Sequence, residues 1–174
     1  DGSVVLWNSS SGAIESLPVP IPFDPADIAV SADGNELYAV SGLFCPRPRA
    51  TRLNGTLLTT LASHSLAKDL HAVRGAAHPS GFIALLSSAT EPGSSQLKVW
   101  DLRKNSMRFE TCIDRPNATS PLLLFGQGAA CSRDGRLVAV AVEDKVRVVD
   151  SMKGKPVGSD LRCSIPASGL NEWN

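Results

Sequence analysis

Few residues of this chain have types and spacing that could do chemistry. Three histidines, His64, His71 and His78, recur at steps of seven residues, a regularity that could suggest a metal site. In an extended chain an odd step places successive side chains on opposite faces, so three convergent nitrogen ligands are not expected. We therefore predict no metal site, and we expect these histidines to be structural or exposed.

The cysteines also lack the spacing of a reactive site. The four stand 67, 19 and 32 residues apart, at Cys45, Cys112, Cys131 and Cys163, and form no Cys-x-x-Cys pair. This pattern argues against zinc and redox motifs, and favours buried thiols in a reducing compartment. Three Asn-x-Ser/Thr triplets, at Asn8, Asn54 and Asn117, would accept glycans in a secreted protein, but turn chemistry explains two of them better. We expect an intracellular protein, cytoplasmic or nuclear.

Known catalytic motifs are absent from the sequence. It contains no nucleophile elbow, zinc-protease helix or phosphate-binding loop, and the Gly-Gln-Gly at 126–128 lacks the third glycine of a dinucleotide motif. The acidic residues near 24–27 and 143–144 lie in turn contexts without a catalytic partner. We predict that the protein is not an enzyme and uses no cofactor.

The composition argues against two classes of partner, nucleic acids and membranes. The 174 residues carry 17 Lys plus Arg against 17 Asp plus Glu, so no net charge attracts nucleic acid or an anionic membrane. A hydrophobic content of 43% with 20% charged residues is typical of a folded globular chain. The longest strongly apolar stretch, near 121–125, is far shorter than the roughly 20 residues that span a bilayer. We expect neither a membrane segment nor direct contact with nucleic acid.

Two landmarks alternate along the chain. The first is a stretch of small residues followed by a polar turn that ends in glycine, at 28–34, 75–81 and 129–135, with the glycines 47 and 54 residues apart. The second is an apolar run that ends in Asn or Asp, at 4–8, 50–54, 97–101 and 146–150, with its last residues 46, 47 and 49 apart. Two landmarks in constant order with nearly the same period indicate a repeat array.

The repeated units consist of strands. After each turn glycine comes a β-rich run that predicts a second strand buried on both faces, at 37–41, 82–87 and 137–142. More polar outer strands are predicted at 13–17, 57–61 and 107–112, and no stretch of 12 or more residues has a helical period. Four short strands per unit of about 47 residues are typical of a blade of a β-propeller.

The sequence of the repeat resembles that of the WD-repeat β-propeller family over nearly the whole chain. The runs Val-Val-Leu-Trp-Asn at 4–8 and Leu-Lys-Val-Trp-Asp at 97–101 look like the family's third strand, and 28–34 looks like its first strand and turn. The resemblance implies a rigid, non-catalytic platform for other proteins. Its structural positions would be Asp1, Trp7, Ser88, Trp100, Asp101 and Asp150. It also implies a hydrogen-bond chain from the Trp100 indole through Ser87 or Ser88 to His64 or His71.

The strand count predicts an all-β propeller of four-stranded antiparallel blades, with about three and a half blades in one partial domain, 1–174. The units are a third strand at 4–8, repeats at about 9–54, 55–101 and 102–150, and a trailing outer strand within 151–174. We expect the chain to belong to a larger, seven-bladed ring, with a closed four-bladed ring as the alternative. Because an open array leaves two blade faces uncovered, we also expect residues 1–174 alone not to remain a soluble monomer.

One loop stands out as a candidate surface for a partner. Residues 42–49 are longer than the turn requires and combine an apolar pair with arginines spaced by prolines; the candidate residues are Leu43, Phe44, Arg47, Arg49 and Arg52. Such a loop could clamp an acidic or phosphorylated partner, although a solvated insertion explains it as well. We expect Arg47 and Arg49 to contribute to binding rather than to folding.

Three functions remain open from the sequence. The favoured one is a scaffold or adaptor that binds other protein subunits in a multi-protein assembly, together with the remainder of its own propeller. The second is a propeller enzyme of the lactonase or quinoprotein type, since 28–40 also looks like those repeats. The third is a propeller that binds nucleic acid or phospholipid through a basic face, for which only the loop at 47–52 and Arg103–Lys104 offer cations, or one that reads a phosphorylated or acidic ligand through its basic loop.

Overall fold

The computed structural model describes residues 3–15, 18–21, 23, 25–41, 49–54, 60–65, 71–88, 94–114, 128–142 and 145–162. Within these ranges every regular element is a β-strand, and all strand pairs are antiparallel. The fourteen strands form one two-stranded and three four-stranded sheets. No described segment is a helix long and apolar enough to cross a membrane.

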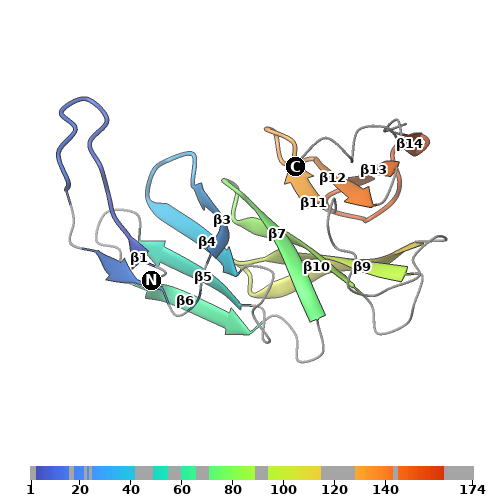
Figure 1. Cartoon of the computed structure of the whole chain (residues 1–174), viewed down its shortest axis with the longest axis horizontal. Coiled ribbons are helices and arrows are strands. Elements are labelled where there is room, and N and C mark those ends of the chain that lie inside the picture. The colour runs from blue at the N-terminus through green and yellow to red at the C-terminus, as the bar shows by residue number, and fades with distance from the viewer. Residues whose placement is uncertain are drawn as a thin grey trace, which may run out of the picture.

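The sheets succeed one another along the chain and across Figure 1. An N-terminal pair of β1 (Ser3–Val4) and β2 (Val19–Pro20) comes first, and its hairpin also contains a bridge between Trp7 and Ile14. Blade 1 consists of β3 (Pro25–Val30), β4 (Glu36–Ser41), β5 (Arg49–Asn54) and β6 (Thr60–Ser65). Blade 2 consists of β7 (His71–His78), β8 (Phe82–Ser88), β9 (Ser94–Asp101) and β10 (Ser106–Asp114). Blade 3 consists of β11 (Gly128–Cys131), β12 (Leu137–Val142), β13 (Lys145–Asp150) and β14 (Leu161–Arg162).

The predicted strands are confirmed most closely where the two landmarks define them. The first, second and third strands of all three blades lie where the sequence predicts them, and β10 includes the predicted outer strand at 107–112. The outer strand β6 begins at Thr60, whereas the prediction covered 57–61, and residues 55–59 lie outside the described part. The outer strand of blade 3 is short, with two residues within the predicted region.

The first landmark is a turn closed by its own side chains. In blade 1 the Ser31 hydroxyl donates to Asp33 Oδ1 at 2.5 Å and accepts the Glu36 N–H at 2.9 Å. Gly34 then takes a φ of 71°, which strains any residue with a Cβ. The turn of blade 3 repeats this arrangement with Ser132, Asp134, Gly135 and Leu137. The turn glycines recur because each turn needs the left-handed conformation.

The second landmark ends in an Asx turn in the N-terminal hairpin and in blades 2 and 3. The Asp150 Oδ1 accepts the backbone N–H groups of Met152 and Lys153, both at 2.8 Å. Asn8 and Asp101 accept the corresponding pairs of N–H groups in the N-terminal hairpin and in blade 2. The Asp or Asn of the repeat is therefore a cap for the hairpin that leads to the outer strand.

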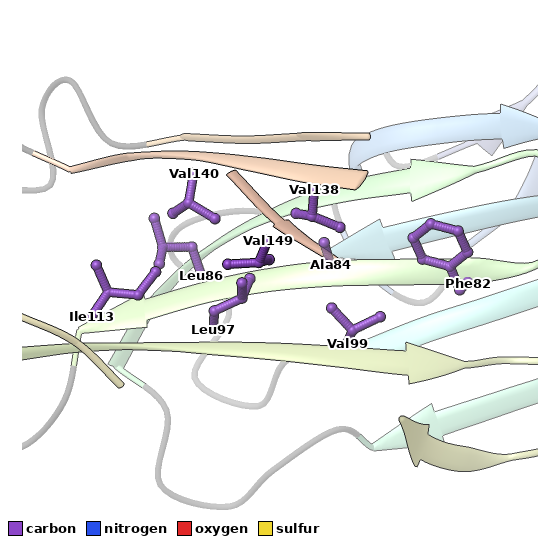
Figure 2. Close-up of a cluster of buried hydrophobic side chains, with 9 residues drawn as sticks. All are labelled: Phe82, Ala84, Leu86, Leu97, Val99, Ile113, Val138, Val140 and Val149. Atoms are coloured by element: carbon purple, nitrogen blue, oxygen red, sulfur yellow. The ribbon is translucent and has the colours of Figure 1, made fainter. Parts of the chain in front are cut away.

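The core lies between the sheets, and the second strands of blades 1 and 2 have a neighbouring sheet on both faces. One cluster joins the N-terminal pair to blade 1: Val4, Ile21, Phe23, Leu37, Ala39 and Leu53. A second joins blade 1 to blade 2: Tyr38, Val40, Ala50, Ile83, Leu85 and Leu102. The third, between blades 2 and 3, is drawn in Figure 2: Phe82, Ala84, Leu86, Leu97, Val99, Ile113, Val138, Val140 and Val149. Alternate side chains of β4 and β8 thus serve different neighbours, as their continuous apolar sequence predicts.

Candidate functional site

The tryptophan position of the repeat is a contact between blades. Trp100 pairs with Ile83 in the β8–β9 ladder and packs against the cluster that joins blade 2 to blade 1. Leu53 and Val149 occupy the same register position in blades 1 and 3, and both are 1% exposed. A large apolar residue at this position therefore covers the preceding sheet. Trp7 is the exception, at 67% exposed, and its expected partner Asp1 lies outside the described residues.

The predicted hydrogen-bond chain from Trp100 is wrong in register. Ser88 pairs with Ser95, five residues along the ladder from the pair formed by Ile83 and Trp100. At about 3.3 Å per residue, the backbone of Ser88 lies roughly 16 Å along the ladder from that of Trp100, and Ser87 is only one residue closer. The Trp100 Nε1 is buried and has no acceptor in the described part of the chain. The sequence located the tryptophan, but the strand register decides which hydroxyls it can reach.

Polar side chains clamp blade 1 to blade 2 around Tyr38. The buried Tyr38 hydroxyl donates to Glu36 Oε2, which also accepts the Arg103 Nε–H at 2.9 Å. Arg52 lies 3.8 Å from the other oxygen of Glu36. Burial, together with the Glu36 carboxylate, raises the Tyr38 pKa to about 12, and the hydrogen bond from Tyr38 lowers the Glu36 pKa. Because Arg103 follows the third strand of blade 2, this cluster ties the turns of the two blades together.

The inner strands of the same two blades are joined by Asp27. Its Oδ2 on β3 accepts the backbone N–H of Ala77 on β7 at 2.8 Å, across 50 residues of sequence. The pairings of β7 with β8 place Arg74 at the corresponding position of blade 2, opposite Leu86, as Asp27 is opposite Val40. The repeat therefore has an arginine at position 74, where blade 1 has the acceptor Asp27.

His78 joins blade 2 to blade 3. The ring is 5% exposed and stacks on Phe82 with centroids 4.8 Å apart. Its Nδ1 accepts the Ser80 N–H at 3.1 Å, so the proton lies on Nε2, which faces the Arg133 carbonyl oxygen at 3.3 Å. Its edge also lies close to Gly135, where an added Cβ would be 2.7 Å from Cε1. His78 therefore has a structural role between the two blades; the side chains of His64 and His71 lie outside the described part.

Two concave surfaces meet at His78, Pro79 and Arg133. The inner cleft, of about 320 Å³, follows the inner strands; it is lined by Asp27, Ala76, Ala77, His78, Pro79, Ala129, Ala130, Cys131, Ser132 and Arg133. The rim cleft, of about 390 Å³, lies between the turns of all three blades; it is lined by Ala32, Asp33, His78, Pro79, Ser80, Arg103, Arg133 and Asp134. The clefts are the candidate functional site, and sequence reasoning missed both because their walls come from different repeats.

The chemistry available in the inner cleft is limited. Burial raises the pKa of the Cys131 thiol to about 11, so the thiol is protonated and a poor nucleophile at neutral pH. Asp27 is engaged by Ala77, and His78 by Ser80 and Arg133. Among the described residues no three His, Cys, Asp or Glu side chains gather as ligands for a metal ion.

The arginine loop predicted as a partner surface is described only at its end. Leu43, Phe44 and Arg47 lie outside the described residues. Arg49 and Arg52 belong to β5, where they pair with Ser65 and Ala62 of β6. Arg52 is part of the clamp through Glu36, which gives it a structural task. The binding role of this loop stays a prediction.

Similarity to solved structures supports the propeller architecture. The WD40 domain of a coronin from Toxoplasma gondii is similar over 95% of this chain and 42% of its own, with a TM-score of 0.65 and 16% identity. Hydrazine synthase from Kuenenia stuttgartiensis matches over 92% of this chain and 48% of its own, with a TM-score of 0.63 and 12% identity. The fold is that of β-propeller blades. The all-β prediction with four-stranded antiparallel blades is confirmed.

The comparisons with known proteins show the fold of this chain but not its family. A functionally unknown protein from Desulfotomaculum acetoxidans DSM 771 matches over 92% of this chain and 48% of its own, with a TM-score of 0.61 and 14% identity. The chain spans less than half the length of these three proteins. No protein-family model and no curated protein matches the sequence. At identities this low the likeness shows the fold alone.

Proposed function

We propose that the chain belongs to a WD-repeat type of propeller that acts as a non-catalytic scaffold and holds other proteins in an intracellular multi-subunit assembly. The observation that carries the proposal is the rim cleft, an open surface formed by turns from three blades. Its frame is held by the Glu36–Arg103 contact on one side and the His78–Arg133 contact on the other. A frame fixed in this way presents its exposed residues in a constant arrangement, which lowers the entropy cost of binding.

The use of the polar groups near the clefts supports the same function. Asp27, Glu36 and His78 each form a hydrogen bond between blades, and the Tyr38 ring lies against the Arg103 guanidinium of blade 2. These residues hold the blades in position and are not available for catalysis. A scaffold needs no catalytic groups, only a stable surface with exposed side chains that can contact a partner. Exposed residues at the rim, such as Ala32 and Lys153, are available for this purpose.

Site-specific photo-crosslinking in cells that make the whole protein tests the proposal. A photoreactive benzoylphenylalanine replaces Ala32, which lines the rim cleft and forms no side-chain hydrogen bond. The matched control carries the same amino acid at Arg162, an exposed position of β14 at the other end of blade 3. We expect covalent adducts with another polypeptide from position 32 and few from position 162. Equal labelling at both positions, or none at position 32, contradicts a protein-binding role for the rim cleft.

A further inference from the structure

The turns at one end of blades 2 and 3 carry an excess of positive charge. In both blades the first-to-second and third-to-outer turns lie at the same end, because Phe82 pairs with Asp101 and Leu137 pairs with Asp150. These turns contain six cations, which we call the basic rim: Arg103, Lys104, Arg133, Arg136, Lys153 and Lys155. The same turns contain three carboxylates, in a chain with no net charge.

The three carboxylates of these turns accept hydrogen bonds from nearby groups of the same blade. Asp134 accepts the Ser132 hydroxyl and the Arg136 N–H, and Asp150 accepts two N–H groups of its own turn. Asp101 caps its turn and also binds the Arg108 guanidinium at 2.9 Å. The turn hydrogen bonds lower the pKa of Asp134 and Asp150. Their charge is therefore used to hold the turns, and the oxygens that accept these bonds are less available to neutralise the rim.

Most of the six cations, by contrast, form no ion pair within the described residues. Within the described residues only Arg103 of the six forms an ion pair, and its side chain is still 44% exposed. Arg136 and Lys153 act on Asp134 and Asp150 only through longer-range attraction. Unpaired cations on a fixed frame attract anions and increase the rate of encounter with a complementary partner.

The rim cleft brings two of these cations to one binding surface. Arg103 borders it from blade 2 and Arg133 from blade 3. Glu36 holds Arg103 through Nε at 2.9 Å, so the guanidinium is oriented while other N–H donors remain for a second acceptor. A planar guanidinium in a fixed orientation suits a carboxylate, which it binds through two parallel hydrogen bonds.

We propose that the basic rim binds an acidic peptide segment of a partner protein, with one carboxylate side chain held in the rim cleft between Arg103 and Arg133. The inference rests on the scaffold function and names the chemistry of its partner. Asp33 and Asp134 also line the cleft, and blade 1 adds Glu36 at the same end, so the positive surface is limited to two blades. Such a bounded surface matches separate carboxylates better than a continuous phosphate backbone.

Fluorescence anisotropy with the purified whole protein tests the proposal. The probe is a fluorescein-labelled peptide of twelve alternating Glu and Ser residues, and the reference peptide has Gln in place of Glu. We expect the Glu peptide to bind and its affinity to fall as salt shortens the Debye length from about 30 Å at 0.01 M to about 8 Å at 0.15 M. The double substitution Arg133→Glu/Lys153→Glu is expected to weaken binding at least about tenfold.

A matched control distinguishes the loss of the rim cations from a general change in net charge. Lys145 and Arg162 pair at the opposite end of β13, so Lys145→Glu/Arg162→Glu changes the net charge equally within the same blade. We expect this variant to retain the affinity for the Glu peptide. Equal loss in both variants, or equal binding of the Gln peptide, overturns the proposal. Tighter binding to a single-stranded RNA of twelve nucleotides or to phosphatidylserine vesicles also overturns it. Crosslinking at position 32 without any peptide binding would retain the scaffold and reject the acidic partner.

Discussion

Trp100 and Trp7 occupy the same place in the repeat and differ in what covers them. Trp100 packs on blade 1, whereas Trp7 is 67% exposed because no described sheet precedes the N-terminal pair. The bridge between Trp7 and Ile14 places a second exposed residue, at 62%, on the same face. Both positions hold a tryptophan within a similar apolar run, so the residue type does not decide its burial. Burial at this landmark depends on whether a neighbouring sheet covers the ring.

The second strands of blades 2 and 3 show the same difference between a covered and an uncovered face. Phe82, Ala84 and Leu86 of β8 face blade 3 and are at most 1% exposed. The alternate residues of β12 that point away from blade 2, Leu137 and Ala139 among them, are only half-buried. Leu161, which is joined to this face through the β13 and β14 pairings, is 60% exposed. A blade of this repeat is therefore complete only when both neighbours are present.

The largest contrast should come from truncating leucines on a covered and an open face. Leu86→Ala leaves a cavity in the cluster of Figure 2 and should cost about 2–5 kcal/mol of unfolding free energy. Leu137→Ala on the open face should cost about 1 kcal/mol or less, since water already reaches the side chain. Denaturant unfolding of both variants measures the difference. Equal costs would mean that the face of β12 is covered in solution.

A pair of glycines isolates the contact between blades 2 and 3. Gly34 and Gly135 have φ values of 71° and 70°, so alanine at either should cost about 1–2 kcal/mol from backbone strain. An added Cβ meets nothing within 4 Å at Gly34, but lies 2.7 Å from His78 at Gly135. Gly135→Ala should therefore cost at least about 1 kcal/mol more than Gly34→Ala, as overpacking does. The same cost for both would show that His78 moves aside freely.

The clamp between blades 1 and 2 should make stability depend on acid. The pKa of Glu36 lies below its ordinary value of 4.5, so its contribution is present above that pH and is lost as the pH falls through the lowered pKa. Glu36→Gln should lower the melting temperature at pH 7, and this effect should decrease as the pH falls below 4.5 and the wild-type carboxylate becomes protonated. Asp160→Asn is the control, because Asp160 also has a lowered pKa but pairs with Arg147 inside one blade. A larger shift for the control would contradict the role of the clamp between blades.

The sequence predicted the parts of the fold that local chemistry determines. Turn glycines, Asx caps and alternating apolar residues are set within a few positions, and they located the first, second and third strands of each blade. Contacts between blades carry no such local signal. The bond from Ala77 to Asp27 spans 50 residues and that from His78 to Arg133 spans 55, so only the stacked sheets reveal them. The proposed partners of Trp100 failed for the same reason, because register within a sheet cannot be read from residue types alone.

The smallest effect on stability is expected at the exposed tryptophan. Trp7→Ser should change the unfolding free energy of residues 1–174 by no more than about 0.5 kcal/mol, because the ring loses little burial. The same substitution should reduce self-association of residues 1–174, which we expect from their two open apolar faces. Size-exclusion chromatography with light scattering measures the second effect, and Lys153→Ser is a control outside these faces. A monomeric wild-type chain would contradict the expected self-association. A loss of several kcal/mol with Trp7→Ser would instead show that the ring is covered in solution, as Trp100 is covered by blade 1.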